Sequence, residues 1–106
     1  MKLVPVALVL GLAVSACSPE KLATDVTRRT AKTVVLPVVR AVTPPPADTM
    51  ATECILMNAS NAELNELARN VGNEAGTLTI QNIRIIAERP STRACIAGKG
   101  LAPLVL

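Results

Sequence analysis

Residues 60–72 read SNAELNELARNVG and decide the fold prediction for this chain. Ser60 followed by Glu63 is the pattern of a capping box, in which each side chain accepts a hydrogen bond from the other residue's backbone amide. Four apolar side chains then recur at helical spacing: Leu64, Leu67, Ala68 and Val71. Gly72 stands where a left-handed helix cap is needed. The segment therefore predicts an amphipathic helix over residues 61–71.

Residues 77–88 admit two interpretations. Leu78 and Ile80 alternate with threonines as in a strand, and β-branched residues favour one. Ile80, Ile83 and Ala87 fit a helical stripe equally well. We favour a helix, because no second strand is evident in the sequence to pair with this segment, and a lone strand is not stable.

The remaining segments of this C-terminal unit are shorter. Residues 50–57 form an apolar run that predicts one or two helical turns. Arg89 precedes Pro90, and because the residue before a proline avoids helical geometry, the helix predicted over 77–88 should end there. Residues 99–106 form an apolar tail that either tucks against the core or stays loose.

Residues 20–36 predict a second amphipathic helix, nearer the N-terminus. Its polar stripe is mostly basic and its other side mostly apolar: Lys21, Asp25, Arg28 and Lys32 against Ala23, Val26, Thr30, Val34 and Val38. Pro37 should end or kink this helix near Leu36, because proline removes a backbone donor. The run Val34–Val39 could alternatively form a short strand.

A proline-rich stretch, residues 43–47 (TPPPA), separates the two helical regions. Consecutive prolines favour a stiff extended spacer. We therefore expect residues 48–98 to fold as a small module, independently of the first helix at residues 17–42. The alternative is one continuous core, in which Val26, Val34 and Val38 pack directly on the Leu64 and Leu67 stripe.

The N-terminal segment is built like a secretion signal. Lys2 supplies a positive start, residues 3–14 are almost all apolar, and Ser15 and Ala16 precede Cys17. This layout is typical of a signal peptide that is removed from the mature protein. A cysteine directly after small residues also resembles the lipobox of bacterial lipoproteins.

The lipobox resemblance covers residues 1–17 and predicts how the N-terminus is processed. It implies cleavage after residue 16, diacylglycerol on the Cys17 thiol and acylation of the new amino terminus. Two alternatives are an uncleaved membrane span and a plain signal peptide with a coincidental cysteine. The apolar stretch is short for a span, which needs roughly 20 residues, so we favour the lipoprotein.

Export would leave Cys54 and Cys95 as an even pair in an oxidising compartment. We predict that they form a disulfide, which a core without any aromatic residue would need. Two separate buried thiols are the alternative. No metal site is predicted, because the chain has no histidine and these cysteines lack the close spacing of zinc ligands.

The composition argues against several functions. The net charge of +3 and the absence of aromatic residues do not indicate a nucleic-acid-binding protein. No histidine is available as a catalytic base, and neither Lys32 nor Lys99 lies in a motif that would activate a serine. Acidic residues in the first helical turn, such as Glu63, are explained by the helix dipole. Three arginines could attract an anionic partner or be solvated charges: Arg84, Arg89 and Arg93.

These observations predict a mostly α protein with an amphipathic N-terminal helix, a proline-rich linker and a disulfide-bridged helical module. We expect a non-enzymatic, lipid-anchored protein of the bacterial cell envelope that faces the periplasm, without a cofactor. Ser18 favours the outer membrane by the sorting rule of the enteric lipoproteins that the segment resembles. The alternatives are an accessory subunit of an envelope enzyme complex and a lipid- or peptide-binding module that uses residues 34–42 and the tail.

Overall fold

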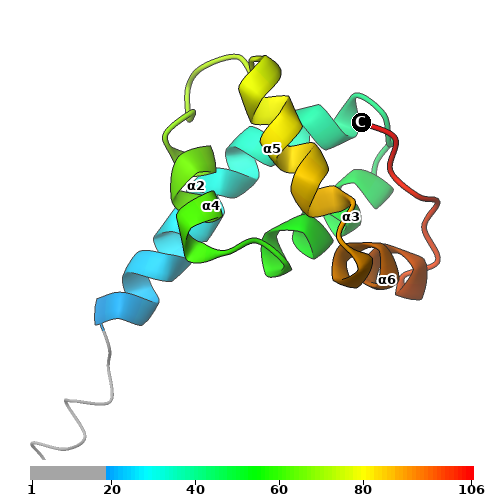
Figure 1. Ribbon diagram of the computed structural model, residues 1–106, viewed down its shortest axis with the longest axis horizontal. Coiled ribbons are helices and arrows are strands. Elements are labelled where there is room, and N and C mark those ends of the chain that lie inside the picture. The colour runs from blue at the N-terminus through cyan, green and yellow to red at the C-terminus, as the bar shows by residue number, and fades with distance from the viewer. Residues whose placement is uncertain (1–18) are drawn as a thin grey trace, which may run out of the picture.

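The computed structural model describes residues 19–106 and folds them into helices joined by short turns (Figure 1). The helices are α2 (Pro19–Arg40), α3 (Ala47–Met57), α4 (Asn61–Ala68), α5 (Thr77–Ala87) and α6 (Pro90–Gly98). No strand occurs among these residues, so the prediction of a mostly helical fold is confirmed. The predicted signal segment and Cys17 lie outside the described residues.

α2 is longer than the sequence predicted, because it continues past Pro37. Proline in a helix interior costs about 3 kcal/mol. Pro37 is exposed, and the helix buries Val35 before it and Val39 after it completely. Each buried valine contributes on the order of 1.5–3 kcal/mol, which offsets the cost of the proline. The predicted helix end near Leu36 and the alternative of a strand over Val34–Val39 are therefore wrong.

The C-terminal half of α2 packs against α3 and α4. Ala31, Val35 and Val39 are fully buried and belong to the same hydrophobic core as Leu64 and Leu67 of α4. This arrangement is the alternative of one continuous core. Of the α2 residues that the alternative named, Val34 is buried and Val38 packs against the core. The expectation of a module that folds apart from the first helix does not agree with these contacts.

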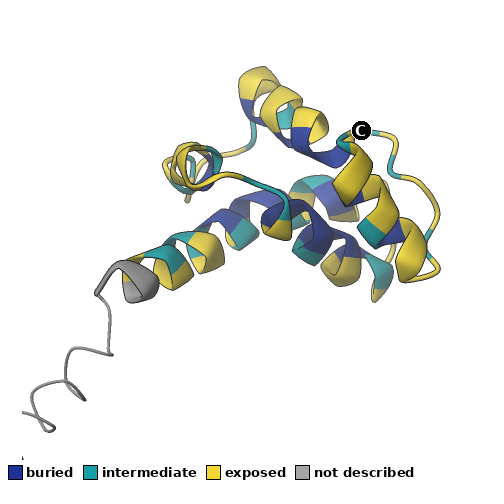
Figure 2. Ribbon diagram, turned by 60° about the horizontal axis from the view of Figure 1, so that its bottom comes forward, coloured by how far each residue is buried: buried dark blue, intermediate teal, exposed yellow. Residues whose placement is uncertain are grey.

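The N-terminal half of α2 protrudes from the core, and the side chains of residues 23–29 are exposed or half-buried (Figures 1 and 2). Val26, which the continuous-core alternative placed against α4, keeps 60% of its surface exposed. Thr27 and Thr30 donate their hydroxyls to the backbone oxygens of Ala23 and Val26, four residues earlier. These bonds satisfy polar side chains within the helix itself.

The proline segment reverses the chain between α2 and α3. An extended spacer would separate these helices, whereas α3 packs directly against α2. Arg40 at the end of α2 donates from Nε to Oδ2 of Asp48, at 2.8 Å, and so joins the two sides of the turn. The predicted polyproline spacer at residues 43–47 is therefore a tight connection.

α4 begins as the sequence predicted and ends earlier. Ser60 accepts a hydrogen bond from the Glu63 amide, and Glu63 accepts one from the Ser60 amide, so the capping box is confirmed. The helix ends at Ala68, because hydrogen bonds between residues three apart tighten the following turn. Val71 consequently remains half exposed, and Gly72 adopts the left-handed conformation with φ of +82°.

α5 confirms the helical interpretation of residues 77–88, with Ile83 and Ile86 fully buried. A further helix, α6, follows at once, because Pro90 occupies its first turn, where a missing amide hydrogen costs nothing. The tail after α6 crosses the core without regular structure. Three leucines of the tail are partly buried against it: Leu101, Leu104 and Leu106.

Candidate functional site

A disulfide between Cys54 and Cys95 joins α3 to α6. The two Cα atoms lie 5.7 Å apart, within the range that such a bond requires. Cys54 is fully buried and Cys95 is partly exposed. The bridge joins residues 41 positions apart and encloses α4 and α5, so it restricts most of the helical unit. The prediction of this pairing is confirmed.

The best-connected polar cluster lies where α4 begins and where α5 passes into α6. Arg89 donates from Nη1 and Nη2 to the two carboxylate oxygens of Glu63, at 2.8 and 2.6 Å. The same Nη1 also donates to the backbone oxygen of Asn58, at 2.7 Å. Arg89 therefore links the end of α3 to the start of α4. This bidentate geometry is the strong form of an arginine–carboxylate pair.

The charges in this cluster stabilise each other. The Arg89 guanidinium lowers the pKa of the Glu63 carboxyl below its ordinary value, and the Ser60 amide lowers it further. Glu63 in turn raises the pKa of Arg89. Because the Glu63 carboxylate and the Arg89 guanidinium already bind each other, this pair holds the helices together and has few hydrogen-bonding positions left for a ligand. Arg89 is thus removed from the predicted anion-attracting face.

Two other ion pairs tie α2 to α3. The Asp48 side chain is buried, and the hydrogen bond from Arg40 lowers its pKa. Lys32 donates from Nζ to Oε1 of Glu53, at 2.7 Å. The sequence places Lys32 on the basic stripe of the first helix, and the structure pairs it with Glu53.

Four arginines form no ion pair within the part of the chain that the structure describes: Arg28, Arg29, Arg84 and Arg93. Arg28 and Arg29 lie on the protruding half of α2, beside a cleft that Lys32 and Glu53 also line. Arg84 and Arg93 are exposed on α5 and α6. The structure thus distributes its unpaired positive charge over two separate regions.

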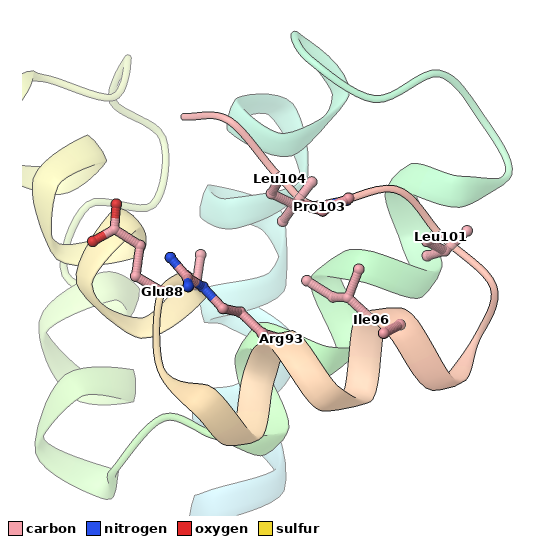
Figure 3. Close-up of a pocket in the computed structure, with 8 residues that line it drawn as sticks. Glu88, Arg93, Ile96, Leu101, Pro103 and Leu104 are labelled. Carbon is pink, nitrogen blue, oxygen red and sulfur yellow. The ribbon is translucent and has the colours of Figure 1, made fainter.

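Two apolar clefts flank the C-terminal tail. One, of about 370 Å³, lies between α2 and the chain end, where Val38, Val42 and Leu106 line it. This cleft brings together the apolar run at residues 34–42 and the tail, as the binding-module alternative requires. The other, of about 400 Å³, lies between the tail and α6, where Ile96 and Leu104 line it (Figure 3).

The described residues carry no group of three potential metal ligands, and none of their helices is long and apolar enough to cross a membrane. Lys99, one of the two lysines considered as a base, is exposed at the end of α6. Comparison with known proteins finds no matching family model, no matching curated protein and no matching solved structure.

The sequence did not predict the partnership of Glu63 and Arg89 or the cleft beside α6. The first joins residues 26 positions apart, and the capping box had already explained Glu63. A usable signal was present for the second, since the tail after Gly100 consists entirely of apolar residues. That pattern indicates contact with a surface, although it does not identify the surface.

Proposed function

We propose that this chain is a lipid-anchored protein of the bacterial cell envelope, which serves as a small interaction or structural module and performs no catalysis. The observation that carries the proposal is the run Val14-Ser15-Ala16-Cys17 behind a short apolar segment. Attachment of more than one acyl chain makes such anchoring stable. The disulfide supports the proposal, because such bonds persist in exported proteins and are rare in reducing compartments.

The protruding half of α2 would lie close to the membrane surface, since it follows Cys17 by only a few residues. Arg28 and Arg29 are exposed there, without an ion pair to any described residue. Each basic residue near an anionic leaflet contributes about 1 kcal/mol. The packed part of the molecule would then be held away from the bilayer, facing the periplasm, with the outer membrane favoured by Ser18.

Labelling with radioactive palmitate in the producing bacterium tests the anchor. The full chain should incorporate the label, and Cys17→Ser should abolish it. Cys54→Ser is the matched control, because it removes a cysteine that is not expected to carry lipid, and it should retain the label. Label that persists in Cys17→Ser would contradict the proposal. Because Cys54→Ser also removes the disulfide, its label is compared per amount of protein recovered, and recovered protein without label would contradict the proposal as well.

A second candidate function, binding of a lipid or peptide, is favoured by the apolar clefts on either side of the tail. Ligand sites in proteins have volumes of roughly 300–1,000 Å³, and both clefts reach the lower part of that range. This function is compatible with a lipid anchor, since it uses the opposite end of the chain.

A further inference from the structure

The cleft between α6 and the tail has an apolar body. Ala87 at the end of α5, Ile96 on α6, and Leu101 and Leu104 on the tail line it. The two tail leucines are only partly buried, although they pack against the core. The tail therefore forms a wall that apolar side chains hold in place. A cleft of about 400 Å³ with such walls suits a single acyl chain.

One end of the same cleft is charged. Glu88 and Arg93 both line it, and Figure 3 shows them together on one side, with Ile96 and Leu101 on the other. Neither residue forms an ion pair with the other or with any other residue among those described. Because Glu88 and Arg93 line the same end of the cleft without pairing, they present a negative and a positive charge to a ligand.

We propose that this cleft binds a single-chain zwitterionic phospholipid, with a phosphate and a primary ammonium group in its headgroup. The phosphate accepts hydrogen bonds from the Arg93 guanidinium, and the ammonium donates to the Glu88 carboxylate. The acyl chain lies along Ile96 under the tail. The inference rests on the second function above and identifies its ligand by chemical class.

The opposite charges decide among the possible amphiphiles. A fatty acid or a lysophosphatidylglycerol would place a negative charge beside Glu88 without a cation to compensate it. A lysophosphatidylcholine carries a quaternary ammonium, which cannot donate a hydrogen bond to Glu88. Only the primary ammonium headgroup satisfies both side chains, and each charge-assisted hydrogen bond contributes on the order of tenfold in affinity.

Photocrosslinking in the full chain tests this inference. The protein is extracted from the envelope in a neutral detergent and mixed with lysophosphatidylethanolamine that carries a diazirine on its acyl chain. After irradiation, mass spectrometry of a digest should locate the label in residues 87–104. Unlabelled lysophosphatidylethanolamine should compete about tenfold better than lysophosphatidylcholine or lysophosphatidylglycerol.

Three exposed positions supply the variants. Arg93→Gln and Glu88→Gln should each reduce labelling about tenfold, whereas Arg84→Gln, the control on α5, should not change it. Circular dichroism checks that each variant keeps its helices. Three results would overturn the inference. Labelling could be unchanged in both cleft variants, it could fall mainly on α2 or residues 1–17, or all three lipids could compete equally. Palmitate labelling of Cys17 is unaffected by any of these results, so the anchor and the cleft can fail separately.

Discussion

The two halves of α2 belong to one helix and behave as two different surfaces. Toward the N-terminus, the face that turns to the rest of the protein carries Thr24 and Thr27, whereas further on it carries Ala31, Val34 and Val35. Only the second set is buried. Helix formation therefore does not distinguish the halves. Burial does, and it begins where the sequence replaces threonine with alanine and valine on the same face.

The sharpest test compares the same substitution in each half of α2. Val35→Asp places an unpaired charge at a fully buried position, so it should destabilise the fold by at least about 3 kcal/mol. Val26→Asp, at a position that is 60% exposed, should change stability by no more than about 0.5 kcal/mol. Urea unfolding followed by circular dichroism measures both. Equal effects of the two variants would show that the division of α2 into a packed and a protruding half is wrong.

The disulfide belongs entirely to the packed region, and its removal should have the next largest effect. Cys95→Ala should lower the free energy of unfolding by about 2–4 kcal/mol, because it frees the loop between α3 and α6 in the unfolded chain. The double variant Cys54→Ala, Cys95→Ala lacks the same single disulfide as Cys95→Ala. Its unfolding midpoint should lie close to that of the single variant, and a midpoint near the unmodified protein would contradict a stabilising bridge.

Arg89 and Arg28 compare a paired arginine of the packed region with an unpaired one of the protruding half. Arg89→Gln should cost about 1–2 kcal/mol at neutral pH, since it breaks a bidentate pair whose side chains keep 35% and 28% of their surface exposed. Arg28→Gln should be close to neutral. The two unfolding curves, measured in the same buffer, give the comparison directly.

Lowering the pH should reduce the stabilisation that the ion pair between Arg89 and Glu63 provides. Because the folded protein lowers the pKa of Glu63, the pair stabilises fully above the ordinary value of 4.5 and loses that stabilisation as the pH falls through the folded pKa. Arg89→Gln should therefore show a smaller loss of stability below pH 4.5 than the unmodified protein. An unchanged acid profile would mean that Arg89 does not shift the titration of Glu63.

Sequence reasoning succeeded where the deciding interactions are local. The capping box joins residues three apart, and the choice of helix for residues 77–88 needed only the absence of a partner strand. It failed at Pro37 and at the proline segment, because burial of Val39 and contact between α2 and α3 override the local preference of proline. The disulfide is predictable from the cysteine count and the predicted export, whereas α6 is not, because Pro90 ends the preceding helical pattern in the sequence and also occupies the first turn of α6.

The smallest effect concerns two threonines, one in each region. The Thr52 hydroxyl is buried in α3 without a hydrogen-bond partner among the described residues, whereas Thr27 on the protruding half donates to the Ala23 oxygen at 2.8 Å. Valine keeps the shape of threonine and removes the hydroxyl, so Thr52→Val should stabilise the protein by about 1 kcal/mol. Thr27→Val should stay within about 0.5 kcal/mol of the unmodified protein. Thermal unfolding of both variants measures the difference, and a Thr52→Val variant that melts lower would mean that an ordered water satisfies this hydroxyl.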